Sequence, residues 1–128
     1  MPLSVQVSER QKPDGLPATV IKLEGSLDST TSPQANQQLA PTLAGGSNFV
    51  EIDLAGLTWI SSAGLGVLIH VSKTLAARGA QCFITNAQPQ IQKVFEIVQA
   101  AKGMSLFSST KELDDYLEAI QRKMTGGG

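Results

Sequence analysis

The run Ser-Ser-Ala-Gly-Leu-Gly at residues 61–66 is the part of the sequence best suited to chemistry. It follows the loop that ends a strand-like segment and opens a helix-like one, so its serines lie at a predicted helix N-terminus. That end of a helix presents unpaired N–H groups and partial positive charge, which favour a phosphate. The two glycines leave little side-chain bulk, so a partner can approach the backbone closely. The run therefore indicates either an ordinary helix cap or a binding surface that phosphorylation controls.

Other reactive residue types do not assemble into a catalytic constellation. His70 lies within a predicted helix with no motif around it, and Cys82 lies in a predicted strand, where a buried, inert thiol is expected. Glu51 and Asp53 alternate with apolar residues, which favours solvated strand positions over a pair of catalytic carboxylates. The glycines of the run lack the lysine of a phosphate-binding loop and the third glycine of a dinucleotide fingerprint. The sequence therefore predicts neither an enzyme nor a site for a metal or cofactor.

Composition narrows the function classes further. The chain has 128 residues and a net charge of −1, which fits one domain and disfavours a nucleic-acid binder. A single cysteine excludes an internal disulfide, and aromatic residues make up only 5% of the chain. Neither a signal peptide nor a membrane-spanning stretch is evident, so a cytoplasmic protein is expected.

The first part of the chain predicts a hairpin followed by a helix. Apolar alternation over residues 3–7 and β-branched residues over 18–23 predict two antiparallel strands. Residues 25–33 are expected to form a loop that ends in a helix with Ser32 as its N-cap. Because a proline ring clashes with the preceding helical turn, Pro41 is expected to kink or end that helix.

The rest of the chain alternates between strand and helix patterns. The expected elements are a strand at 49–54, a loop at 56–60, a helix at 61–78, a strand at 80–85, a helix from Pro89 to Gly103, a short edge strand at 106–107 and a last helix after a Ser109/Glu112 capping box. This order predicts an α/β domain with a mixed sheet of four or five strands and about four helices, packed mainly on one side. The expected core includes Val50, Ile52, Leu54, Leu65, Leu68, Ile69, Ile84, Val94, Phe95 and Leu117.

Three segments together resemble the STAS domain family, specifically the stand-alone bacterial anti-sigma factor antagonists. Residues 23–28 (Leu-Glu-Gly-Ser-Leu-Asp) resemble the family's strand-ending G-x-L-D segment. Residues 50–54 followed by 60–67 resemble its D-L…S-(S/T)-G-L-G signature, and residues 86–98 resemble the segment before its C-terminal helices. The resemblance implies one STAS-type domain over 1–124, followed by a flexible glycine-rich tail at 125–128.

The resemblance also implies a phosphorylation site. In the family the first serine of the signature is modified, and that position is Ser62 here. Ser61 stands where the family usually has aspartate, which makes Ser61 an alternative acceptor, and Ala63 stands where a second hydroxyl is usual. The residues expected to bind the partner are Asp28, Ser61, Ser62, Ala63, Gly64, Leu65 and Gly66.

The implied partners are a serine-kinase-type anti-sigma factor, which binds the unphosphorylated chain, and a PP2C-type phosphatase, which restores that state. No contact with nucleic acid and no membrane insertion are expected, and the free protein is expected to be a monomer. An alternative is a non-catalytic STAS subunit of a lipid or anion transport complex, without a phosphoswitch. A third hypothesis is a small-ligand sensor or an enzyme, and a nucleotide or metal bound to the purified protein would favour it.

Overall fold

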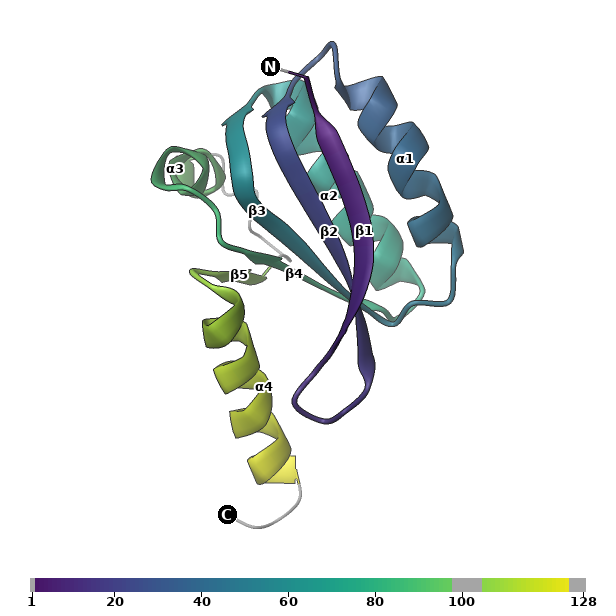
Figure 1. Ribbon diagram of the computed structural model, residues 1–128, viewed down its shortest axis with the longest axis vertical. Coiled ribbons are helices and arrows are strands. Elements are labelled where there is room, and N and C mark those ends of the chain that lie inside the picture. The colour runs from purple at the N-terminus through teal and green to yellow at the C-terminus, as the bar shows by residue number, and fades with distance from the viewer. Residues whose placement is uncertain (1, 98–104, 125–128) are drawn as a thin grey trace.

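The computed structural model describes residues 2–97 and 105–124, which form one sheet with helices on both of its faces (Figure 1). The order of elements is the one that the sequence predicts. Their bounds are β1 (Ser4–Gln11), β2 (Pro17–Leu27), α1 (Ser32–Ala44), β3 (Phe49–Ile60), α2 (Ser62–Ala77), β4 (Gln81–Thr85), α3 (Pro89–Ile97), β5 (Ser105–Phe107) and α4 (Thr110–Met124).

The strands lie in the order β1-β2-β3-β4-β5, so the chain lays each new strand beside the previous one. β1 and β2 pair antiparallel as a hairpin, and the three later pairings are parallel. The turn residue Gly15 has a φ of +83°, a left-handed conformation that glycine adopts without strain. This mixed α/β sheet confirms the predicted fold class, including the hairpin.

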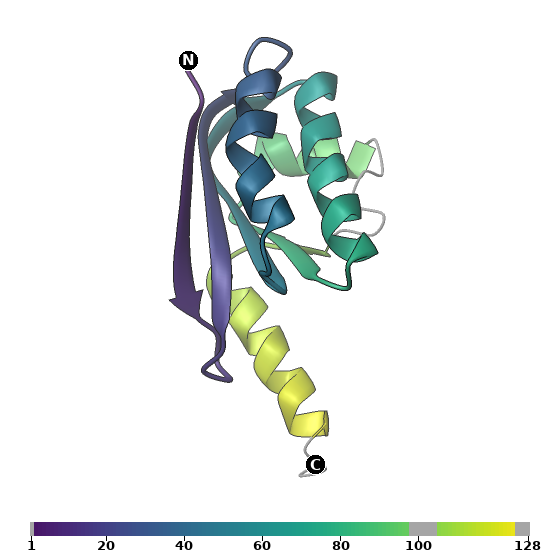
Figure 2. The same ribbon diagram turned by 90° about the vertical axis from the view of Figure 1, so that its right-hand side faces the viewer.

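The two faces of the sheet carry different cores. The larger cluster contains Ile21, Ile52 and Ile84 from the three central strands, together with buried residues of α1, α2 and α3. Figure 2 shows α1 and α2 side by side against that face. A smaller cluster on the opposite face joins Phe49 and Phe83 to Leu113 of α4. Three of the described helices thus cover one face, as the sequence predicts.

The expected core residues all pack in these clusters. Seven of them are buried, whereas Ile69, Val94 and Leu117 are partly buried at the cluster margins. α2 ends as predicted, because Gly79 has a φ of +79° just after the helix. The start of α4 agrees with the predicted cap at Ser109, since the Ser109 hydroxyl accepts from the Glu112 N–H at 3.1 Å.

Two predicted loops are partly or wholly strand instead. β2 continues to Leu27, so the loop predicted at 25–33 is shorter than expected and spans residues 28–31. β3 continues through residues 56–60 to Ile60, so the loop predicted there is wrong. The two extensions pair with each other in parallel, with register shifts that accommodate the irregular sequence. Gly56 permits this pairing, because a Cβ there would lie 2.6 Å from Cγ of Glu24.

The predicted start of α1 needs correction, and so does an early end of this helix at Pro41, whereas the glycines at 45 and 46 close the segment as the sequence predicts. The N-cap is Thr31, and Ser32 is already helical, one residue earlier than expected. Pro41 lies inside the helix, which runs on to Ala44. Pro41 is exposed, so water can satisfy the carbonyl that its missing N–H leaves unbonded. The predicted helix end at Gly103 and the tail at 125–128 lie outside the described residues.

Glu51 departs most clearly from its expected solvated position. Its side chain is 1% exposed on the sheet face that α4 covers, and Arg10 donates to it from Nε at 2.8 Å. The hydroxyls of Thr85 and Thr110 donate to the other carboxylate oxygen at 2.8 and 2.7 Å. Arg10 also binds Asp114 of α4 through two nitrogens. A buried charge requires such partners, so this carboxylate joins β1, β3, β4 and α4.

Candidate functional site

The predicted site lies where the carboxyl ends of β2 and β3 meet. Leu27 and Ile60, the last residues of the two strands, face each other in the sheet register. The Ser61 N–H donates to the Leu27 carbonyl at 3.0 Å, so the turn into α2 is held against the end of β2. This arrangement brings the loop before α1 and the start of α2 to the same end of the sheet.

Ser61 is the N-cap of α2. Its backbone is extended, and its hydroxyl oxygen accepts from the Gly64 N–H at 3.2 Å. The side chain therefore satisfies one of the N–H groups that a helix start leaves unbonded. Ser61 is partly exposed, but its oxygen already has a structural role.

Ser62 is the first helical residue, and its side chain is exposed. Among the residues that the structure describes, its hydroxyl has no hydrogen-bond partner. The hydroxyl is therefore free for an external group. Because it lies in the first turn, a negative charge added there interacts favourably with the helix dipole.

Asp28 organises the loop between β2 and α1. Its Oδ1 accepts from the Thr30 hydroxyl at 2.7 Å and from the N–H groups of Thr30 and Thr31 at 2.9 and 3.1 Å. The Thr30 hydroxyl above all, with these N–H groups, holds the pKa of Asp28 below its ordinary value of 3.8. Asp28 directly follows Leu27, so it lies beside the start of α2, and its carboxylate shapes the loop there.

The two glycines of the run have different surroundings. Gly64 is buried, and a Cβ there would lie 2.2 Å from the Leu27 carbonyl oxygen. Gly66 is exposed, and a Cβ there would meet nothing within 4 Å. Leu65 between them is 6% exposed and belongs to the larger core. Gly64 and Leu65 thus position the helix, whereas Gly66 has no packing role within the described chain.

A shallow groove of about 430 Å³ lies between α1 and α2. Ala63 and Gly66 line it from α2, together with His70, and Asn36 and Ala40 line it from α1. Sequence reasoning missed the contribution of α1. The sequence did carry a signal for the α2 side of this groove. The α2 residues that line it lie on one helical face, because they recur at helical spacing: Ala63, Gly66, Val67 and His70.

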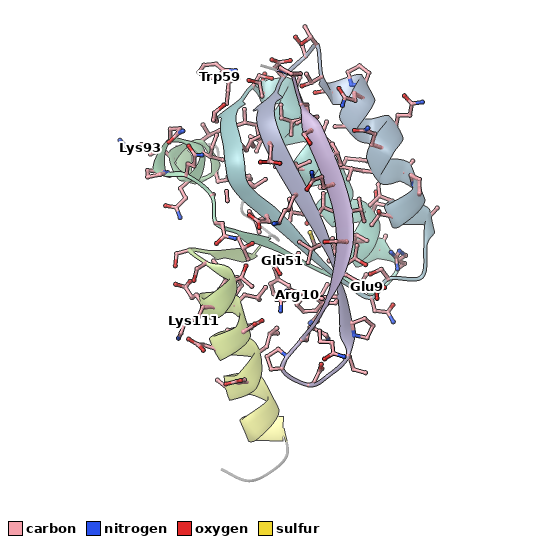
Figure 3. All side chains as sticks on the ribbon, viewed as in Figure 1. Glu9, Arg10, Glu51, Trp59, Lys93 and Lys111 are labelled. Atoms are coloured by element: carbon pink, nitrogen blue, oxygen red, sulfur yellow. The ribbon has the colours of Figure 1, made fainter. Side chains whose placement is uncertain are left out.

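Trp59 is the other residue whose importance the sequence did not indicate. Its side chain is 61% exposed near the carboxyl end of β3, at the end of the sheet where α2 begins (Figure 3). Exposed tryptophans are enriched among residues that dominate protein–protein binding energy. Trp59 lies three positions before Ser62 in the chain.

The remaining reactive residues fit no other chemistry. Burial raises the pKa of the Cys82 thiol to about 12, which agrees with the inert thiol that the sequence predicts. His70 is exposed on α2. No group of three or more potential metal-ligating side chains occurs among residues 2–97 and 105–124. Within the same described ranges, no helix combines the length and apolarity that a membrane span needs.

Comparisons with known proteins show the family to which the chain belongs. The model of the STAS domain family matches residues 7–113. Two relatives are named as anti-sigma factor antagonists, the first of them as a putative one. BtrV of Bordetella bronchiseptica is 35% identical over 59% of this chain and 65% of its own length. The anti-sigma-B factor antagonist of Staphylococcus epidermidis is 29% identical over 60% of this chain and 71% of its own length. The match to BtrV thus covers slightly less than two thirds of that protein.

A solved structure shares the fold along nearly the whole chain. The crystal structure of an anti-sigma factor antagonist from Mycobacterium paratuberculosis superposes with a TM-score of 0.75 at 19% identity. The superposition covers 93% of this chain and 94% of that one.

Proposed function

Because the chain belongs to the STAS domain family, we propose that it is a phosphorylation-controlled anti-sigma factor antagonist. It acts as a non-catalytic binding module, and the group that is modified is the Ser62 hydroxyl. The observation that carries this proposal is the exposure of that hydroxyl in the first turn of α2, where no described residue forms a hydrogen bond with it. The relatives that bear the name anti-sigma factor antagonist support the class of partner.

The structure favours Ser62 over Ser61 as the acceptor. The Ser61 oxygen accepts the Gly64 N–H, so its modification would disturb the cap of α2. The Ser62 oxygen has no such bond and can receive a phosphoryl group without loss of the helix start. We therefore assign the phosphorylation to Ser62 alone.

The binding surface consists of Ser62, Ala63 and Gly66, which are exposed, with the groove between α1 and α2 beside them. Gly64, Leu65, Ser61 and Asp28 hold this surface in place. The unphosphorylated surface binds a serine-kinase-type anti-sigma factor, which supplies the ATP and the phosphoryl transfer. A phosphoserine dianion in the contact must lose its water when the partner docks. Burying such a charge is costly unless a basic group pairs with it, so the complex dissociates.

The remaining parts of the cycle follow from this mechanism. A PP2C-type phosphatase removes the phosphoryl group and restores binding. The protein acts in the cytoplasm, where its kinase partner and ATP are present. It makes no contact with nucleic acid and does not insert into a membrane.

Substitutions of Ser62 test the proposal. We expect Ser62→Ala to bind the anti-sigma factor encoded in the same genome with wild-type affinity and to resist phosphorylation. Ser62→Glu should bind about a thousandfold more weakly, which corresponds to about 4 kcal/mol. Calorimetric titration measures the affinities, and mass spectrometry of intact protein after incubation with the kinase and ATP maps the modified residue.

Ser61→Ala is the matched control, because it removes a neighbouring hydroxyl. It should lower stability by about 1 kcal/mol through loss of the cap but should leave phosphorylation intact. Equal affinity of Ser62→Glu and wild type for the anti-sigma factor would contradict the proposal. Copurification with a transporter ATPase, unaffected by Ser62→Glu, would favour the transport-subunit alternative.

A further inference from the structure

β1 forms an open edge of the sheet. It pairs with β2 on one side through eight consecutive residue pairs, and no described strand lies on its other side. Figure 2 shows β1 at the margin of the molecule, away from α2. An edge strand presents a row of unpaired backbone N–H and C=O groups, which can pair with another strand.

This edge has only some of the features that protect edge strands from pairing, namely the charged residues Glu9 and Arg10 near its end. The segment Ser4–Gln11 contains no proline and no lysine, and its register with β2 has no bulge, unlike the pairing of β2 with β3. Val7, in the middle of the strand, is 49% exposed. A β-branched apolar residue at an open edge suits burial against a neighbouring strand.

We propose that β1 pairs antiparallel with β1 of a second copy of this chain, so that the two sheets become continuous across a two-fold axis. This interaction surface is independent of the Ser62 surface and replaces the monomer expected from the sequence. A two-fold dimer of this kind places the same edge on both sides, so the edge must be self-complementary.

The faces of β1 restrict the register. Val5 packs toward the larger core, whereas Arg10 binds Glu51 on the opposite face, so odd-numbered and even-numbered residues of β1 lie on different faces. Directly opposed residues of an antiparallel pair share a face, so odd residues must meet odd residues of the other copy. Registers that set Glu9 against itself or Arg10 against itself bring like charges together and are disfavoured.

The register with Val7 on the two-fold axis satisfies these conditions best. It places Val7 against Val7, Val5 against Glu9 and Ser4 against Arg10. The registers centred on Ser8 and on Gln6 avoid like charges too. The first sets Val7 against Glu9 and leaves the exposed valine without an apolar partner. The second sets Val7 against Val5 but pairs only residues 4–8 of each β1. The Val7-centred register therefore pairs Ser4–Arg10 of each copy and removes Val7 from water.

The dimer should be weak. Stable interfaces bury roughly 1,200–2,000 Å² in total, and one strand from each copy contributes less than that. We therefore expect a dissociation constant of about 10 µM to 1 mM. Sedimentation of the full chain over that range should show the average mass rising from 13.5 kDa toward twice that value. A mass that stays at the monomer value up to about 1 mM would overturn the proposal.

Substitutions at Val7 test the register. Val7→Lys and Val7→Glu each put two like charges on the axis and should weaken self-association at least about tenfold. Val7→Thr, a matched β-branched control without charge, should retain most of it. An equal mixture of Val7→Lys and Val7→Glu should associate again, because opposite charges then face each other.

Circular dichroism of each variant verifies that the exposed position tolerates the change. Undiminished association of Val7→Lys, or failure of the mixture to associate, would overturn the proposed pairing. Retained binding of the anti-sigma factor by Val7→Lys would separate this edge from the Ser62 surface.

Discussion

Gly64 and Gly66 lie two positions apart in α2, but only Gly64 is required by packing. The Leu27 carbonyl occupies the space that a Cβ at Gly64 would need, whereas Gly66 faces open space. A glycine inside a helix costs about 1 kcal/mol relative to alanine, so a helical glycine without a packing role suggests an external constraint. Under the proposed function, that constraint at Gly66 would be close approach of the partner.

Alanine at the two positions should therefore have opposite effects on stability. Gly64→Ala should lower the free energy of unfolding by about 1–3 kcal/mol through overpacking. Gly66→Ala should raise it by about 1 kcal/mol and yet weaken binding of the anti-sigma factor. Urea denaturation and calorimetric titration measure the two quantities. If Gly66→Ala bound the partner as well as wild type does, the groove would not be the contact surface.

The start of α2, which forms part of the candidate site, could be predicted from the types of its residues. Serines before a helix and glycines after them are local signals, and they indicated a helix start with a cap at residues 61–66. The family resemblance, not the local pattern, singled out Ser62, and the structure shows that Ser61 is the cap. The burial of Glu51 was not predictable in this way. Its partners Arg10 and Thr110 are 41 and 59 positions away, so the alternation within β3 indicated only a polar face.

Among the elements, α4 depends most on a few polar contacts. It contributes Leu113 to the smaller core, and Asp114 binds Arg10, which in turn binds buried Glu51. Beyond the sheet the helix projects away from the rest of the fold (Figure 1). The attachment of α4 is therefore concentrated in its first turns.

Removal of Arg10 should destabilise the fold strongly. Arg10→Ala leaves Glu51 as a buried charge with hydroxyl partners only, which should lower the free energy of unfolding by about 3 kcal/mol. Lys111→Ala is the control, because its ion pair with Asp115 is exposed to water and should contribute little to stability. Urea denaturation of both variants measures the difference. Similar losses in the two variants would contradict a special role for the buried pair.

The type and order of elements were predictable because apolar periodicity is local. The extensions of β2 and β3 were not, because neither residues 25–27 nor residues 56–60 have a strand pattern of their own. Pairing between the two extensions keeps both of them extended. A pairing of that kind joins segments distant in sequence, and short windows of sequence do not indicate it.

In the whole molecule, one end carries the proposed switch and a natural spectroscopic probe. Trp59 is the single tryptophan of the chain and is 61% exposed near the start of α2. The hairpin tip between β1 and β2 lies at the opposite end of the sheet (Figure 1). A partner that docks on the Ser62 surface should therefore cover Trp59 and leave the hairpin tip free.

Fluorescence should detect that docking directly. Emission of Trp59 should shift to shorter wavelength as the anti-sigma factor is added, because the indole moves from water into an interface. The same titration with Ser62→Glu should show no shift, since the complex does not form. Binding of wild type by calorimetry without any change in emission would mean that the partner docks away from this end.

The burial of Cys82 has a practical consequence for such measurements. Its thiol is the only one in the chain, and its pKa of about 12 keeps it protonated at neutral pH. A cysteine introduced at the exposed hairpin position Leu16 would then be the sole reactive site for a maleimide dye. Mixing copies labelled with a donor dye and copies labelled with an acceptor dye would allow energy transfer to measure distances between copies. A single dye and the native indole would do the same within one copy, without further changes to the chain.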